Sequence, residues 1–312
     1  MSKKVSSPAA VRADIYETIT GTIVAALEQA ASPTEWPWIK SAAQGVPLNA
    51  RTRKPYNGVN RLLLGIAAMA GASRYWASFN QWRELGATVR KGSKGTLITY
   101  WGDTYVHEET GEKVAPDHPK AKKIVYAKGS YVFNADQVDG WQAPAQGEAV
   151  PSVSSVEGLE AVEAFVAATG ATVTEAGSQA FYSPAADSIT MPVRQRFKAT
   201  DSASATEHFY GVLMHELVHW TGPKTRCDRD LSGRFGDQAY AFEELVAEIG
   251  SAFLCGDLGI VPQPRADNVE YVRHWLAVLK GDKKAVFTAA SLSRKASEYL
   301  HAMQPVALAE AA

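Results

Sequence analysis

The sequence has 312 residues, of which 46% are hydrophobic and 21% are charged, and its formal net charge is -1 at pH 7. This composition is typical of a globular protein, excludes a disordered or low-complexity chain, and leaves room for two domains. The two cysteines, Cys227 and Cys255, are too few for a disulfide scaffold and indicate a reducing compartment. The N-terminus lacks the apolar segment of a signal peptide, and no run approaches the ~20 apolar residues that span a bilayer. We therefore expect a cytoplasmic protein without a membrane partner.

The charges are divided unevenly along the chain. Residues 1–150 carry 18 Lys and Arg against 13 Asp and Glu, whereas the remainder carries 14 against 20. Between residues 40 and 94, ten basic residues stand against Glu84 alone. This division predicts a basic module with an acidic partner, joined to an acidic module. A solvated basic face without a partner is the alternative.

The N-terminal half predicts helices followed by a small sheet. Apolar residues at i, i+4 spacing predict a first helix over residues 10–31. Further helices are expected over residues 57–71 and 79–85. β-Branched and aromatic residues predict strands over residues 96–101 and 123–133, joined by a polar hairpin excursion.

A change of composition separates the two halves. Residues 142–155 are rich in Pro, Ala, Ser and Gln, which predicts a linker between domains at residues 1–141 and 156–312. Beyond the linker, the pattern predicts a helix, two strands and then a mostly helical remainder. Their expected positions are residues 156–169, 171–175, 180–191 and from Thr206 onward.

An H-E-x-x-H motif at residues 215–219 indicates a metal site. On a helix, His215 and His219 lie on one face, so both imidazoles reach one ion. Glu216 lies beside them and is suited to remove a proton from water at the metal. Ser204 and Glu207 form a capping box that would start the helix. Coincidence on a core helix is the alternative.

A zinc site of this class needs a third protein ligand. The apolar helix predicted at residues 240–254 carries Glu244 and Glu248 on one face, where two unpaired carboxylates would be costly to desolvate. We expect Glu244 to be the third ligand and Glu248 to orient a ligand histidine. Glu243 is the nearest rival to Glu244. The expected cofactor is Zn²⁺, with other divalent transition metals as alternatives.

The expected chemistry is peptide hydrolysis. Residues 182–192 predict an extended strand with a turn, of the kind that flanks a metallopeptidase cleft and pairs with a peptide, although an ordinary edge strand fits equally well. Such a site also needs a group that stabilises the oxyanion. Tyr182, Tyr240 and His208 are the candidates, and the sequence leaves the choice open.

Cations and aromatic rings alternate between residues 49 and 101. Lys and Arg neutralise phosphates, and exposed rings stack on unpaired bases, so the combination favours single-stranded over duplex DNA. The alternative is that most rings belong to the core. The candidate contacts are Arg51, Arg53, Lys54, Tyr56, Arg61, Arg74, Trp76, Trp82, Arg83, Arg90, Lys91 and Lys94.

The chain resembles the ArdC-type antirestriction proteins of conjugative plasmids over nearly its whole length. The C-terminal resemblance is carried by His215-Glu216-Leu-Val-His219-Trp-Thr-Gly222 and Glu243-Glu244-Leu-Val-Ala-Glu248. A region similar to the N-terminal half also occurs in plasmid primases. The N-terminal resemblance is carried by Pro47-Leu-Asn49, Lys54-Pro-Tyr56-Asn-Gly58-Val-Asn60, Phe79-Asn-Gln81-Trp82, Gly86, Val89-Arg-Lys-Gly92 and Val132-Phe-Asn134-Ala-Asp-Gln137.

The resemblance implies an N-terminal single-stranded DNA-binding domain and a C-terminal zincin-like metallopeptidase domain. It also implies a role in protecting incoming plasmid DNA from host restriction enzymes. In similar regulator-cleaving metallopeptidases, a Glu ahead of Ala and a polar residue is the third ligand, which here corresponds to Glu244. That polar residue is Glu248 in this chain, where Asn is more usual.

We therefore expect an α+β protein with two domains, an N-terminal helix-plus-small-sheet domain that binds single-stranded DNA and a mostly helical zincin-like domain. The zincin-like domain could act on a protein substrate, which the sequence does not name. A DNA-coating protein with a structural or vestigial metal site, acting by occupancy only, is the main alternative. A plain host metallopeptidase without DNA affinity is the third.

Overall fold

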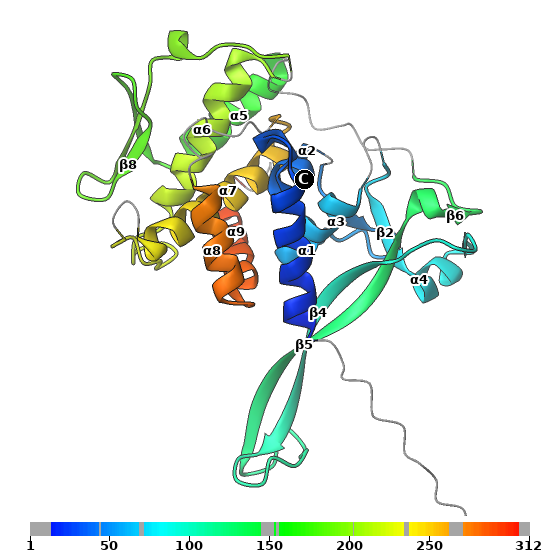
Figure 1. Ribbon diagram of the computed structural model, residues 1–312. Helices are drawn as coiled ribbons and strands as arrows, with labels where there is room; N and C mark the ends of the chain where they lie inside the picture. The colour runs from blue at the N-terminus through cyan, green and yellow to red at the C-terminus, as the bar shows by residue number, and fades with distance from the viewer. Residues whose placement is uncertain are drawn as a thin grey trace, which may run out of the picture.

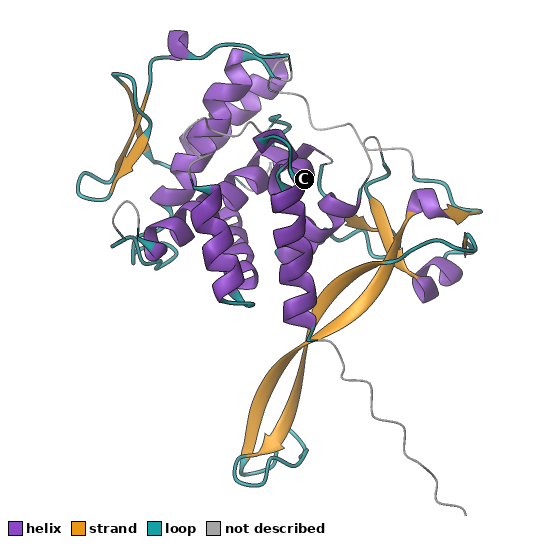
Figure 2. Cartoon of the chain, viewed as in Figure 1, coloured by secondary structure: helices purple, strands orange, loops and turns teal. Residues whose placement is uncertain are grey.

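The computed structural model describes residues 14–43, 45–68, 72–144, 153, 156–201, 203–233, 237–261 and 271–305. The two sheet-containing regions lie on opposite sides of the molecule, with most of the long helices between them (Figure 1). Figure 2 shows the same division, because the helices gather in the middle and the strands lie at the periphery. The expected α+β architecture is confirmed.

The N-terminal region places short helices against a four-stranded sheet of order β1-β2-β5-β4. β1 and β2 are parallel, whereas β2–β5 and β5–β4 are antiparallel. The strands are β1 (Leu48–Asn49), β2 (Tyr75–Ser78), β4 (Thr96–His107) and β5 (Ala121–Asn134), with a separate pair β3 (Thr88–Val89) and β6 (Val138–Asp139). The helices are α1 (Ile15–Gln29), α2 (Pro37–Ala43), α3 (Val59–Ala67) and α4 (Phe79–Glu84), with short 3-10 turns at Pro33–Glu35 and Ala135–Gln137.

β4 and β5 form a long antiparallel ribbon that projects from the body of the molecule (Figure 1). Their pairing runs from Thr96–Val132 to His107–Ala121, well beyond the expected strand ends. Gly102 lies within β4, where the ring of Tyr126 occupies the space that a side chain at this position would need. The polar excursion is correspondingly shorter than the sequence predicts.

The C-terminal region combines helices with a three-stranded sheet of order β7-β9-β8. One strand was expected over residues 180–191, with a turn within residues 182–192; the turn is present, but it divides the segment into two antiparallel strands. The segment forms a hairpin, because Asp187 takes a positive φ of 47° between the two strands. The elements are α5 (Val156–Ala168), β7 (Thr172–Glu175), β8 (Phe181–Ser183), β9 (Ser188–Met191), a 3-10 turn at Arg194–Arg196, α6 (Ala205–Trp220), α7 (Gln238–Asp257), α8 (Val272–Gly281) and α9 (Ala285–Ala302).

One hydrophobic core joins the two regions. It contains Ile19 and Ile23 of α1 together with Leu217 of α6 and Ile249 of α7. The N-terminal Trp36 and Trp38 both meet the ring of Trp275 edge-on, at centroid distances of 5.3 and 5.4 Å. The N-terminal helices therefore pack on the C-terminal ones. Residues from both sides of the expected linker at 142–155 contribute to the same hydrophobic core.

Most of the expected linker, apart from residues 142–144 and 153, lies outside the described residues, as does the start of the expected first helix. A buried ion pair reinforces the contact between the regions, since Arg61 Nη1 of α3 lies 2.9 Å from Asp257 Oδ1 of α7. Across the described ranges, no helix is both long and apolar enough to cross a membrane.

Candidate metal centre and nucleic-acid interface

Helix α6 presents the H-E-x-x-H motif from a well-defined start. The Ser204 side chain accepts a hydrogen bond from Glu207 N, and the Glu207 carboxylate accepts one from Ser204 N, which is the expected capping box. The helix then carries His215, Glu216 and His219 into the packed space between α6 and α7, and His215 and Glu216 are both almost fully buried.

The two histidines and Glu244 converge on one point. His215 Nε2 and His219 Nε2 lie 3.1 Å apart. The two carboxylate oxygens of Glu244 lie 3.4 Å from His215 Nε2 and 3.5 Å from His219 Nε2. Suitable ligand atoms of these three residues all lie within 4.8 Å of one another. Two imidazoles and a carboxylate so arranged fit a divalent transition metal and leave a position for water.

Two further carboxylates lie behind the imidazoles. Glu248 Oε1 is 3.0 Å from His215 Nδ1, and Glu243 Oε1 accepts a hydrogen bond of 3.2 Å from His219 Nδ1. A carboxylate at Nδ1 fixes the ring orientation and directs Nε2 toward the metal. Glu244 thus lies at the Nε2 atoms of the two imidazoles, whereas Glu243 and Glu248 lie at their Nδ1 atoms.

The close contacts between carboxylates and imidazoles shift the pKa values of Glu244 and His219. Burial opposes ionisation of Glu244, but hydrogen bonds from His215 and His219 hold its pKa well below the ordinary value. Burial also opposes the charged form of His219 and by itself would lower its pKa. Glu243 and Glu244 outweigh this effect and raise the pKa of His219 to about 10. Without an ion, a proton on His219 thus offsets the carboxylate charge, and a metal cation would take the place of that proton.

A cavity of about 250 Å³ opens beside the cluster and is lined by Glu216, His219 and Glu244. Of the three oxyanion candidates, Tyr182 and Tyr240 line this cavity. His208 is not among its lining residues and has Thr200 Oγ1 3.4 Å from its Nε2. The other lining residues are Ala180, Phe181, Pro184, Asp230, Leu231, Gly233, Ala239, Glu243 and Tyr271.

The two tyrosines differ in what holds their hydroxyl groups. Tyr182 donates to Asp187 at 2.8 Å and accepts from Arg226 at 3.1 Å, so its hydroxyl is held within a surface network. Tyr240 lies one helical turn before Glu244 on α7. Burial, the charge of Glu244 and hydrogen bonds with Tyr271 and Glu244 raise its pKa, which keeps its phenol protonated.

Three of the expected DNA contacts are wrong, because the structure buries them. Trp82 and Trp76 are 0% and 3% exposed, so neither ring is available to stack on a base. Arg61 is also buried, where it pairs with Asp257 and donates to Phe253 O. Tyr56 is partly buried, and its hydroxyl is held by Asn49. The remaining candidates are exposed: Arg51, Arg53, Lys54, Arg74, Arg83, Arg90, Lys91 and Lys94.

The exposed rings of this region are ones that the candidate contacts omit. Phe79 at the start of α4 is 53% exposed, and Tyr131 on β5 is 60% exposed. Phe133, which is half-buried, meets Phe79 edge-on and shares a strand face with Tyr131. Strand alternation predicts that Tyr131 and Phe133 share a face, and this signal could have found them from the sequence. Tyr100, Trp101 and Tyr126 are exposed on the β4–β5 ribbon.

Several residues that carry the family resemblance hold the N-terminal region together. The Asn60 side chain pairs with the free edge of β4, donating to Thr99 O at 2.6 Å and accepting from Thr99 N at 2.8 Å. Asn134 and Gln137 form a capping box at the end of β5. These contacts are structural: they hold the loops and strands of the N-terminal region in place.

Comparisons with known proteins cover both regions. Residues 13–133 match the N-terminal domain of the anti-restriction factor ArdC, and residues 160–292 match the zincin-like metallopeptidase family. The metal-free crystal structure of antirestriction protein ArdC from plasmid R388 has a TM-score of 0.74 and 37% identity, covering 93% of this chain and 97% of that chain. Its Mn(II)-bound structure gives 0.73 and 35%, covering 93% and 98%.

Related sequences extend the comparison. An uncharacterised protein, y4eC, of Sinorhizobium fredii is 39% identical over 93% of this chain and 92% of its own length. A DNA primase TraC of Escherichia coli is 32% identical over 93% of this chain, but the match covers only 20% of that primase. The region shared with the primase is therefore about one fifth of a much longer protein.

Proposed function

Since the chain belongs to the ArdC-type antirestriction proteins, we propose that it protects incoming plasmid DNA by binding single strands through an exposed aromatic face. We define this aromatic face as Phe79, Tyr131 and Phe133, with Arg83 and Lys94 beside them. The observation that carries the proposal is the exposure of Phe79 and Tyr131 in a region where eight basic side chains are also exposed.

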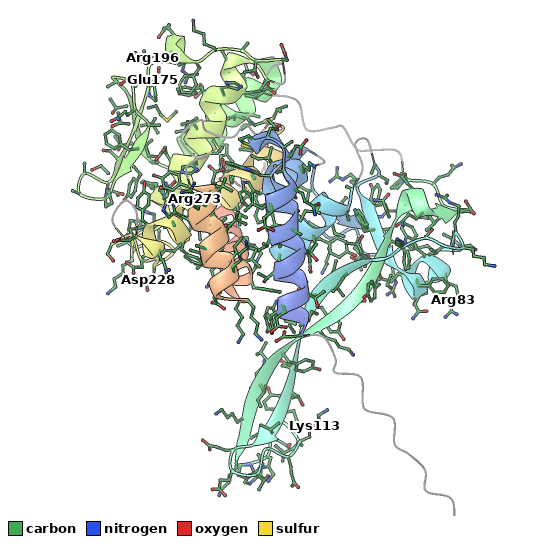
Figure 3. All side chains as sticks on the ribbon, in the orientation of Figure 1. Arg83, Lys113, Glu175, Arg196, Asp228 and Arg273 are labelled. Atoms are coloured by element: carbon green, nitrogen blue, oxygen red, sulfur yellow. The ribbon has the colours of Figure 1, made fainter. Side chains whose placement is uncertain are left out.

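The cations lie close to these rings. Arg83 is four residues after Phe79 on α4 and therefore lies on the same side of that helix. Lys94 precedes Gly95, where a side-chain carbon would come within 3.1 Å of the Phe133 ring and of the Tyr131 Cβ, so the backbone beside Lys94 runs against these two residues. Arg83 extends outward at the edge of the molecule (Figure 3).

This arrangement favours unpaired DNA on physical grounds. Exposed rings stack on bases at about 1–3 kcal/mol per base, and a duplex hides the base faces that they need. The exposed cations neutralise phosphates on either kind of DNA. A face with both groups therefore binds single strands more tightly than duplex and with little sequence preference.

The C-terminal site is proposed to be a zinc-dependent hydrolase centre. His215, His219 and Glu244 would hold the ion, which when bound supplies a Lewis acid that makes its water acidic. Glu216 lines the cavity next to His219 and is the base that removes the proton from the attacking water. Glu243 and Glu248, at the Nδ1 atoms, fix the orientation of the two imidazole rings. The peptide would enter along the cavity beside β8.

Tyr240 is the residue that we assign to the oxyanion. Its protonated phenol lies one helical turn before Glu244, beside the candidate metal cluster, and lines a cavity that Glu216 also lines. Tyr182 is the less suitable choice, because Asp187 and Arg226 hold its hydroxyl in a network that does not include the candidate metal cluster.

Two variants test which of the two sites carries antirestriction. A Phe79→Ala/Tyr131→Ala double variant should lose protection of incoming DNA from a restriction enzyme, because both exposed stacking rings are removed. A Glu216→Gln variant asks whether hydrolysis is also needed, since it leaves the aromatic face untouched. Full protection by the double variant would contradict the proposed DNA-binding role. Full protection by Glu216→Gln would favour a protein that acts by occupancy alone.

A further inference from the structure

Arg229 is a buried cation in the connection between α6 and α7, close to the candidate metal centre. Its side chain is 1% exposed. The neighbouring Asp228 lies far from Arg83 across the molecule (Figure 3), so this connection is remote from the aromatic face. A buried guanidinium is expensive unless carboxylates and carbonyls satisfy it, so its partners indicate what it does.

The partners of Arg229 come from both helices of the site. Its Nε and Nη2 donate to the two carboxylate oxygens of Glu243 on α7, at 3.0 and 2.9 Å. Its Nη1 donates to Thr221 Oγ1 at 2.7 Å, and Nη2 also donates to Val218 O at 2.6 Å, both at the end of α6. The planar fork of a guanidinium fixes the plane of a carboxylate that it grips with two hydrogen bonds.

Glu243 in turn contacts His219, one of the proposed metal ligands. Its Oε1 also accepts the hydrogen bond from His219 Nδ1, at 3.2 Å. Arg229, Glu243 and His219 thus form a continuous chain that ends at the imidazole. We propose that Arg229 is a positioning residue, which clamps Glu243 so that His219 directs Nε2 toward the ion. This inference rests on the metal site of the proposed function.

A purely structural role is the competing explanation, because Arg229 also links the end of α6 to α7. The two roles predict different results for the metal. A structural link affects the free energy of unfolding alone, whereas a positioning residue changes how tightly, and in what geometry, the ion is held. The same connection offers a matched control in Arg226, which is also largely buried but pairs with Asp187 and lies over the ring of Trp220.

The test uses the full chain loaded with Zn²⁺ or Co²⁺. Zn²⁺ affinity is measured by competition with a chromophoric chelator, and the visible spectrum of bound Co²⁺ reports the coordination geometry. Arg229→Met should weaken Zn²⁺ binding about 10- to 100-fold and alter the Co²⁺ spectrum. Arg226→Met should leave both unchanged. Arg229→Lys should recover only part of the affinity, because an ammonium cannot grip both carboxylate oxygens.

A double-variant comparison identifies the path. If Arg229 acts through Glu243, adding Glu243→Gln to Arg229→Met should weaken Zn²⁺ binding little further. The inference is overturned if Arg229→Met, or Arg229→Lys where the Met variant does not fold, only lowers the melting temperature and leaves affinity and spectrum as in the wild type. A wild-type protein that binds no metal would instead overturn the proposed metal site, and the inference with it.

Discussion

His215 Nε2 and His219 Nε2 face each other at 3.1 Å, and the carboxylate of Glu244 lies against both. Three ligand atoms in this position should hold one divalent ion per chain. We therefore expect elemental analysis of the purified protein to find about one zinc, and a His215→Ala/His219→Ala double variant to contain none. Retention of the full metal content by that double variant would show that the ion binds elsewhere.

Glu216 should be separable from the ligands, because the ligand atoms of His215, His219 and Glu244 converge in a cluster that does not include Glu216. Glu216→Gln keeps the shape of the side chain and removes the base. We expect metal content and affinity to stay near those of the wild type while cleavage of a fluorogenic peptide library is abolished. Loss of the metal from this variant would make Glu216 a ligand and reverse the assigned roles.

The oxyanion assignment predicts a difference between two tyrosines of one cavity. Tyr240→Phe removes the proposed donor and should slow peptide cleavage by about 10²- to 10³-fold without loss of metal. Tyr182→Phe removes a hydroxyl that Asp187 and Arg226 hold, and should have the smaller effect on cleavage. Equal losses, or a larger loss for Tyr182→Phe, would refute the assignment of Tyr240.

The shared core predicts that both regions unfold together. Trp275 is fully buried and meets Trp36 and Trp38, so Trp275→Ala should lower the free energy of unfolding by about 3–5 kcal/mol and shift one common transition. Trp101, which is 55% exposed, is the matched control, and its change to Ala should have a much smaller effect. Two separate transitions in a denaturant titration followed by circular dichroism would contradict a single cooperative unit.

The sequence predicted the cluster of His215, His219 and Glu244 better than the proposed aromatic face, for a physical reason. Helical periodicity alone places His215 and His219 on one face. Helix α7 is rich in apolar residues, so its burial, and with it the burial of Glu244, could be expected from the sequence. In the short β2 and α4, no period distinguishes an inward ring from an outward one. Trp76 and Trp82 therefore resemble stacking residues in the sequence, although the structure assigns them to the core.

Long-range packing accounts for the other differences. Arg229 lies in a connection without periodic pattern, and only the folded chain brings it to Glu243. The apolar faces of α1 and α2 predict burial but do not say against what, so the core that they share with α7 and α8 was not foreseen. A turn was expected within residues 182–192, but its division of the segment into two paired strands depends on a positive φ at Asp187, which a non-glycine residue adopts only rarely.

Binding of the full chain to labelled single-stranded and duplex DNA, followed by fluorescence anisotropy over a series of salt concentrations, tests the central claim most directly. The wild type should prefer the single strand. Replacing Phe79 and Tyr131 with Ala should weaken binding by about 1–3 kcal/mol per ring with little change in the salt dependence. Replacing Arg90, Lys91 and Lys94 should instead flatten that dependence, by about 0.7 in slope per lost phosphate contact. Phe181→Ala, an exposed ring on β8 across the molecule, is the control and should bind like the wild type. Equal affinity for both kinds of DNA, or unchanged binding by the Phe79→Ala/Tyr131→Ala variant, would contradict recognition of single strands by the aromatic face.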